Sequence, residues 1–173
     1  MQVRLGYVAN ALRFENCSPS RTITLAHLKK IGGSREQAGR LETIARENLR
    51  NTLRILKGNI YDGIHIYRLT SKLVPFCTHP AYLFWDWSAA LKEDLAEVGA
   101  FVRKQRLRVS LHPDHFTLLN SPHPAVNEAI CIIICGFWRG WDWEMKLKCR
   151  STSAVNTRIM KRRWAGSGKV SPP

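Results

Sequence analysis

The residues best suited to chemistry lie in the stretch RVSLHPDHFTLLNSP, residues 108–122. An alternating apolar run that is typical of a strand ends there in His112, Asp114 and His115, which surround a proline. Imidazole and carboxylate groups bind divalent metals and move protons, so the stretch could form part of a reactive site. Aspartate after proline is also ordinary turn chemistry. Spacing alone leaves both interpretations open.

Two other candidate residues follow strand-like runs in the same way. Tyr7 lies at the end of a first run, residues 2–9, and His79 follows a second run, residues 63–70. In parallel α/β folds the chemistry gathers at the carboxyl ends of the strands. If the sheet curls into a barrel, Tyr7, His79 and His112 converge on one rim.

A long helix is predicted over residues 34–59. Ser34 and Gln37 stand in capping-box spacing at its start, and Gly58 stands near its C-cap. The second strand-like run contains His65, which we expect to be a packing residue. The apolar residues of the helix fall at helical spacing on one face, comprising Leu41, Ile44, Ala45, Leu49, Leu53 and Leu56.

Further strand and helix signals continue the alternation. A second helix is predicted over residues 88–105, a third strand over 107–113, and a third helix opens at residue 124. Three β-α units in series, with connections of this length, imply parallel strands, so we expect an α/β fold. The second helix should bury one face, made of Leu91, Leu95, Val98 and Val102.

The composition favours a polyanionic partner. Lysine and arginine number 27 against 13 acidic residues, which gives a formal net charge of +14. Nucleic acid is favoured over a membrane surface because no cationic amphipathic helix stands out. The five cysteines form no CxxC pair, and neither a signal peptide nor a long apolar run is recognisable. We therefore expect a reduced, cytoplasmic protein with no membrane association.

Several segments, taken in order, closely resemble the N-terminal part of bacterial UV damage endonucleases. They include VRLGYVA, IHIYRLTSKLVPFCTHP and LKEDLAEVGAFVRKQRLRVSLHPDHFTLLNSP, and the resemblance covers about residues 2–135. It implies a TIM-type (β/α)8 barrel, of which residues 1–135 would supply about three β-α units. It also implies divalent metal ions, usually manganese, and nicking of double-stranded DNA on the 5′ side of UV photolesions.

The resemblance also implies roles for individual residues. His79 and His112 match two metal-ligand histidines of the family, and Tyr7 matches a tyrosine at the DNA-facing rim. His115 and Phe116 match the polar and aromatic pair that probes the duplex opposite the lesion. In some relatives this pair is Gln-Tyr. A wedge of this kind would favour damaged pairs, because they are already partly unstacked and are easier to open.

Residues 136–173 differ in character from the rest of the chain. They hold four of the six tryptophans and nine basic against two acidic residues, with no sustained helical or alternating pattern. The family's later metal ligands find no counterparts after Ile134. Permitted codons for this tail, read in another frame, can encode a family-like strand, HIGGKY. We therefore expect residues 136–173 to be an out-of-frame tail.

Three functions are compatible with these features. The preferred one is a metal-dependent DNA repair endonuclease, of which this chain would be a nearly inactive part, because catalytic metals generally need at least three protein ligands. A second is another divalent-metal barrel enzyme, such as an abasic-site endonuclease or a sugar isomerase. The His115–Phe116 pair and the basic rim argue against the isomerase. A third is a non-catalytic, basic nucleic-acid-binding fragment.

Overall fold

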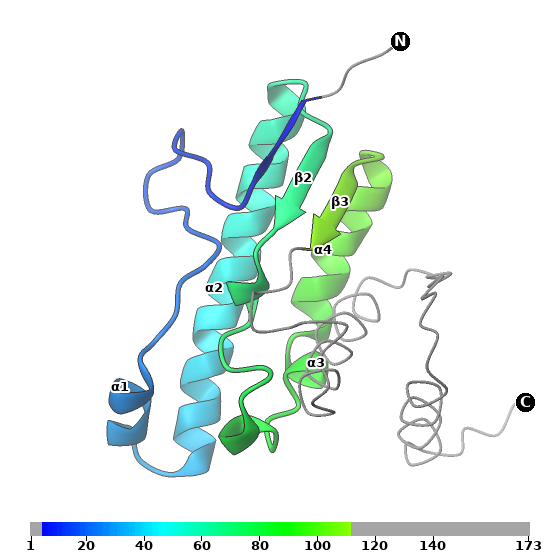
Figure 1. Ribbon diagram of the computed structural model, residues 1–173. Helices are drawn as coiled ribbons and strands as arrows, with labels where there is room; N and C mark the ends of the chain where they lie inside the picture. Colours follow the sequence, from blue (N-terminus) through cyan, green and yellow to red (C-terminus); the bar gives the residue numbers. More distant parts are fainter. Residues whose placement is uncertain (1–4, 112–173) are drawn as a thin grey trace, which may run out of the picture. The chain divides into compact units, whose positions relative to one another are not determined.

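A computed structural model describes residues 5–111 of the chain (Figure 1). His112, His115 and Phe116, the third predicted helix and the domain boundary predicted after residue 135 lie outside the described residues. Two 3₁₀ turns, η1 (Ser71–Leu73) and η2 (Pro80–Tyr82), follow the second strand. The regular elements, in chain order, are β1 (Gly6–Val8), α1 (Leu25–Lys30), α2 (Ser34–Tyr61), β2 (Ile66–Leu69), α3 (Trp87–Ala90), α4 (Lys92–Lys104) and β3 (Arg108–Leu111).

The three strands form a parallel sheet in the order β1-β2-β3. In this register Tyr7 lies beside Tyr67, which in turn lies beside Val109. Parallel neighbours require a crossover connection, and α2 and α4 supply the helices of the two crossovers. The predicted α/β class with parallel strands is confirmed for this part of the chain.

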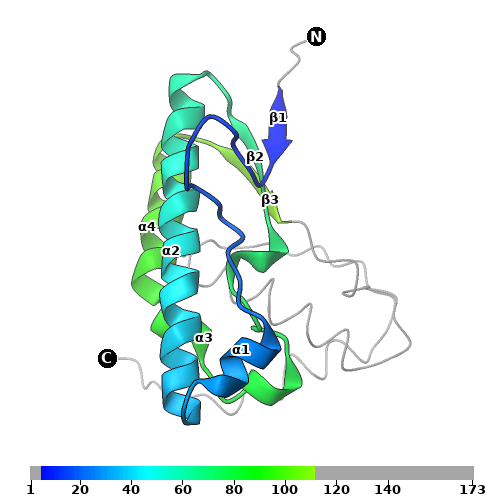
Figure 2. The ribbon, with the colours of Figure 1, turned by 90° about the vertical axis from the view of Figure 1, so that its left-hand side faces the viewer.

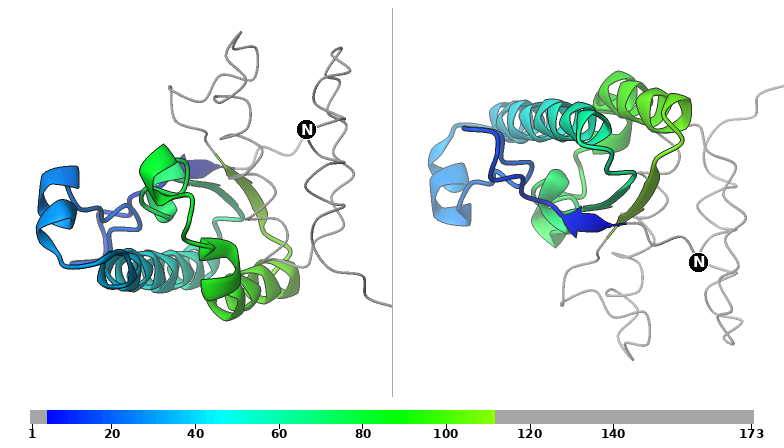
Figure 3. Two further views of the ribbon diagram at one scale, coloured as in Figure 1. Left: turned by 90° about the horizontal axis from the view of Figure 1, so that it is seen from below. Right: turned by 90° about the horizontal axis from the view of Figure 1, so that it is seen from above.

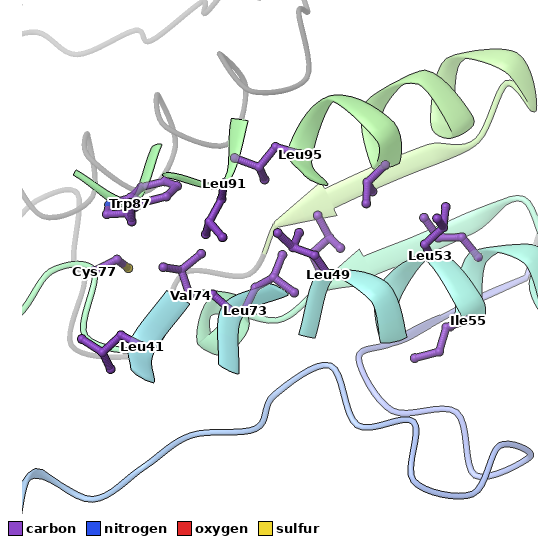
Figure 4. Close-up of a cluster of buried hydrophobic side chains, with 14 of the residues drawn as sticks. Leu41, Leu49, Leu53, Ile55, Leu73, Val74, Cys77, Trp87, Leu91 and Leu95 are labelled. Atoms are coloured by element: carbon purple, nitrogen blue, oxygen red, sulfur yellow. The ribbon is translucent and has the colours of Figure 1, made fainter. Parts of the chain in front are cut away.

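Helices α2 and α4 pack side by side over the same face of the sheet (Figures 2 and 3). The core forms between these helices and the strands, and Figure 4 shows Leu49 of α2 near Leu95 of α4. All of the apolar residues predicted on the two helical faces are buried. No helix within residues 5–111 is both long and apolar enough to cross a membrane.

The start of α2 differs from the prediction. Gly33 is the N-cap, in an extended conformation, and no side chain caps the helix there. Ser34 is therefore the first helical residue, and the predicted capping box is wrong. The Gln37 side chain instead donates hydrogen bonds to the carbonyl oxygens of Ile31 at 3.2 Å and Gly32 at 3.1 Å. Sequence spacing does not determine which residue is the N-cap. Here the N-cap is Gly33, one residue before the predicted Ser34.

The end of α2 also differs, because Gly58 lies inside the helix and not at its C-cap. A Cβ atom at Gly58 would lie 2.3 Å from Cζ of Phe14, so glycine is required for the close approach of that ring. The helix continues to Tyr61, and Gly63 takes the left-handed conformation after it, with φ at 69°. Packing against Phe14, and not helix termination, accounts for Gly58.

Three smaller differences concern the other elements. The single helix predicted over residues 88–105 is divided at Leu91 into α3 and α4. Asp86 begins α3 by accepting a hydrogen bond from the backbone N–H of Ala89 at 3.1 Å. His65 precedes β2 and is exposed, so the prediction of a packing residue is wrong. Tyr7 is the middle residue of β1, not its end.

Candidate functional site

Two loops follow the carboxyl ends of neighbouring strands, residues 9–24 after β1 and residues 70–86 after β2. The first turn of the β1 loop is anchored to β2 at Ala9, whose φ of 53° lies in the left-handed region. Ala9 donates its N–H to the carbonyl oxygen of Arg68 at 2.9 Å and accepts from the Tyr67 hydroxyl at 2.6 Å. These bonds hold a conformation that alanine adopts only with strain.

Asn48 ties both loops to α2 and is fully buried. Its Oδ1 accepts from the backbone N–H of Arg21 at 2.9 Å, and its Nδ2 donates to the carbonyl oxygen of Arg21 at 2.9 Å. The same Nδ2 reaches the carbonyl oxygen of Leu73, in the β2 loop, at 3.1 Å. A buried amide with all its polar atoms bonded fixes the segments that it joins.

Sequence reasoning missed Asn48, although a signal for it exists. It stands at helical spacing from Leu41 and Ile44, in the middle of the apolar face of α2. A polar residue at such a position must find hydrogen-bond partners inside the protein, because burial without them is costly. An asparagine within an apolar helical face therefore indicates a buried polar contact.

His79 lies on the β2 loop and caps the η2 turn. Its Nδ1 accepts a hydrogen bond from the backbone N–H of Ala81 at 3.2 Å. The ring centroid is 5.5 Å from that of Phe76 and 5.6 Å from that of Tyr82. Phe76 itself has φ at 57°, and its carbonyl oxygen accepts the N–H of His79 at 3.0 Å. A strained turn and two aromatic rings thus set the position of the imidazole.

The cap has a consequence for metal binding by His79. A neutral imidazole has one N–H and one lone pair, so an Nδ1 that accepts a hydrogen bond leaves the proton on Nε2. A metal bound through Nδ1 would take up that lone pair, and a metal bound through Nε2 would place the proton on Nδ1. The Ala81 hydrogen bond and metal coordination by neutral His79 therefore exclude one another.

Tyr7 is half-buried and its hydroxyl is engaged by the helical layer. The hydroxyl donates to Oδ1 of Asn59 on α2 at 2.5 Å, and the ring meets Tyr67 edge-on at a centroid distance of 5.6 Å. Burial raises the pKa of Tyr7, and the Asn59 hydrogen bond partly opposes that rise. The Nδ2 of Asn59 is buried without a hydrogen-bond partner among the described residues. The DNA-facing role of Tyr7 stays a prediction.

The described residues do not by themselves form a metal site. Within residues 5–111 there is no group of three or more histidine, cysteine, aspartate or glutamate side chains that could hold an ion. Of the two predicted ligands, this part of the chain contributes His79, and His112 lies outside it. Within residues 5–111, Tyr7 is engaged by Asn59 and Tyr67, and His79 by Ala81, Phe76 and Tyr82, so no hydrogen bond or ring contact joins the two.

An arginine links α2 to the helices that follow the site loop. Arg46 contacts Glu42 on its own helix at 2.8 Å and Asp94 of α4 at 2.9 Å. It also donates to the carbonyl oxygen of Ala90, the last residue of α3, at 3.0 Å. The hydrogen bond with Glu42 raises the pKa of Arg46. These contacts fix the exit of the β2 loop against α2.

Comparison with known proteins gives consistent matches. The family model described as UV-endonuclease UvdE matches residues 3–134. A UV DNA damage endonuclease of Halalkalibacterium halodurans is 42% identical over 121 residues, which cover 70% of this chain and 38% of the relative. A UV DNA damage endonuclease of Bacillus velezensis is 41% identical over 122 residues, with the same coverage of 70% and 38%.

A solved structure shares the fold. The crystal structure of SacUVDE aligns with a TM-score of 0.68 at 23% sequence identity, over 83% of this chain and 47% of that chain. The chain spans 38% of the length of the curated relatives that it matches. Because the family model covers well over half of the chain and the relatives are about 40% identical, this chain belongs to the UV-endonuclease UvdE family.

Proposed function

We propose that this chain is part of a DNA repair endonuclease that nicks double-stranded DNA on the 5′ side of UV photolesions. The observation that carries the proposal is the match of residues 3–134 to the UvdE family, whose matched relatives are UV DNA damage endonucleases. The anchored loops at the carboxyl ends of a parallel sheet support it, because that edge is where α/β enzymes bind their ligands.

We also propose that the sheet is part of a (β/α)8 barrel. The strands β1, β2 and β3 are parallel and in sequence order, with the helices on one face. Tyr67 and Leu69 are buried toward that face, while Arg68 between them alternates to the other side. In a closed barrel, the side that carries Arg68 and its neighbour Ser110 would line the interior.

Dependence on a divalent metal, with manganese as the ion, is a further part of the proposal. His79 and His112 would be two of its ligands, and the others would come from outside the described residues. When bound, the ion would polarise the scissile phosphate and lower the pKa of a bound water. The described residues would orient His79 through Phe76 and Tyr82, and loading would require the loss of the Ala81 hydrogen bond.

For DNA recognition we propose that Tyr7, His115 and Phe116 contact the duplex near the lesion. The excess of basic residues, with a net charge of +14, would supply salt-dependent affinity for the phosphates. The same charge also favours the alternative of a basic nucleic-acid binder without catalytic activity.

Nicking of supercoiled plasmid tests the proposal. Irradiated, unirradiated and depurinated plasmids are incubated with manganese, using the 173-residue chain and a form with the reading frame restored near Cys135. We expect the restored form to nick irradiated plasmid selectively and to lose this activity when a chelator removes the metal. The 173-residue chain should nick little. Selective nicking of depurinated plasmid would favour an abasic-site endonuclease, and salt-sensitive binding without nicking would favour the basic binder.

The assignment of His112 as a metal ligand is tested with the His112→Ala variant of the frame-restored form. Loss of a metal ligand removes stabilisation of the transition state, whereas phosphate affinity is spread over many basic residues. We expect nicking to be abolished and binding of DNA to be largely kept. Retained nicking by this variant would contradict the ligand assignment.

A further inference from the structure

Two neighbouring apolar side chains are exposed on the loop that carries His79. Leu83 is 50% exposed and Phe84 is 55% exposed. They stand between two buried aromatic residues, Tyr82 and Trp85, which are 4% and 7% exposed. Exposed apolar neighbours next to a candidate site are informative, because scattered single ones are common on any surface.

The loop holds this pair in place. Tyr82 donates its N–H to the carbonyl oxygen of His79 at 2.9 Å, and Trp85 donates to the carbonyl oxygen of Tyr82 at 3.1 Å. Trp87, which begins α3, is buried and donates its backbone N–H to the carbonyl oxygen of Trp85 at 2.9 Å. The exposure of Leu83 and Phe84 is therefore a property of an anchored turn, as the position of Trp87 in the core shows (Figure 4).

A series of aromatic contacts connects the exposed pair with His79. The Tyr82 ring lies 5.6 Å from the His79 ring and 6.0 Å from the Phe84 ring, measured between centroids. Phe84 is thus separated from the candidate metal ligand by a single buried ring.

The other exposed large hydrophobics of the described residues lie elsewhere. Leu5 and Val8 belong to the β1 region. Leu12 belongs to the loop after β1, and Tyr61 is the last residue of α2, where the Arg13 guanidinium sits over its ring at 5.4 Å. That end of α2 precedes β2, so it lies at the opposite edge of the sheet from the strand ends (Figure 1).

We propose that Leu83 and Phe84 contact an unstacked base of the DNA substrate, with the Phe84 ring stacking on its face. This inference rests on the proposed function, since it places the contact beside the same site. The net charge of +14 repels a second copy of the chain and attracts a polyanion. Bases present flat apolar faces that stack on aromatic rings regardless of sequence, and damaged duplexes expose them more readily.

Binding without nicking tests this contact. Fluorescence anisotropy of labelled single-stranded and irradiated duplex oligonucleotides is measured in chelator with the 173-residue chain and its variants. We expect Phe84→Ala to weaken single-strand affinity roughly tenfold, because base–aromatic stacking is lost. Phe84→Trp should keep the affinity and Leu83→Ala should reduce it less. Leu5→Ala, at a residue 79% exposed just before β1 and so at the amino ends of the strands, is the matched control and should leave affinity unchanged.

Distinct results would overturn the inference. Unchanged affinity of Phe84→Ala contradicts it, and so does an equal loss with Leu5→Ala. The unsubstituted chain could sediment as a dimer and the Phe84→Ala variant as a monomer, with the same DNA affinity. That result would instead assign Leu83 and Phe84 to a contact between two copies of the chain. Failure of the proposed function has a separate signature: the frame-restored form leaves irradiated plasmid intact while the Phe84-dependent binding persists.

Discussion

His79 accepts, at its Nδ1, a hydrogen bond from the backbone N–H of Ala81 at 3.2 Å, so the residue predicted to bind metal also caps a turn. The two roles use the same ring in incompatible states, because a neutral imidazole has only one free lone pair. Metal loading would therefore release the Ala81 N–H and loosen the start of the turn that leads to Leu83 and Phe84.

Two substitutions at His79 should separate these roles. The side-chain oxygen of asparagine can accept the Ala81 hydrogen bond, whereas alanine cannot. We expect His79→Ala to lower the free energy of unfolding by about 0.5–1 kcal/mol and His79→Asn to change it little. Urea denaturation measures both. In the frame-restored form both variants should lose manganese-dependent nicking, and activity of His79→Asn would rule out the ligand role.

Asn48→Ala should be among the most destabilising changes in this part of the chain. It leaves the N–H and carbonyl of Arg21 and the carbonyl of Leu73 without their partner. We expect a loss of about 3 kcal/mol in the free energy of unfolding, because buried polar groups left unpaired carry their full desolvation penalty. Asn51→Ala is the control, since Asn51 is half-buried and donates its Nδ2 to the Ser18 carbonyl at 2.9 Å. A loss no larger than that of Asn51→Ala would contradict the role of Asn48.

Two glycines of α2 should respond oppositely to alanine. At Gly39 a Cβ meets nothing within 4 Å, so Gly39→Ala should stabilise the helix by about 0.5–1 kcal/mol. At Gly58 the added Cβ would lie 2.3 Å from the Phe14 ring, which must move. We expect Gly58→Ala to destabilise the protein by roughly 1–3 kcal/mol, as overpacking does. Thermal denaturation measures the change in stability for both variants. Stabilisation by Gly58→Ala would show that the Phe14 ring does not pack against Gly58.

Stability should fall at alkaline pH, in part because of Tyr67. Burial raises the pKa of the Tyr67 hydroxyl above its ordinary value of 10.0. Above about pH 10 the unfolded chain loses this proton while the folded chain keeps it, so the free energy of unfolding should decrease by about 1.4 kcal/mol per pH unit from this group. Below pH 10 the group makes no pH-dependent contribution. Urea denaturation between pH 8 and pH 11 should show a shallower decline for Tyr67→Phe, and identical slopes would contradict the assignment.

Local pattern predicted the regular elements well. The apolar faces of α2 and α4 follow from helical spacing, and their residues are buried as expected. The order of strands and helices also sufficed for a parallel sheet, because crossovers of this length leave few alternatives. The family was recognisable from the same residues, since its motifs are spread in order along the chain.

The tertiary structure decided what depends on contacts between distant residues. Gly58 looks like a helix-terminating glycine in the sequence, but its role is set by Phe14, which arrives from the loop after β1. Asn48 acquires its partners only when the loops after β1 and β2 fold against α2. Tyr7 and His79 have the residue types of a site, yet the structure engages Tyr7 with Asn59 and His79 with Ala81. The periodicity of apolar residues indicates which face of a helix or strand is buried. Hydrogen-bond partners and ring contacts depend instead on which loop packs against that face. Only the folded chain determines which loop this is.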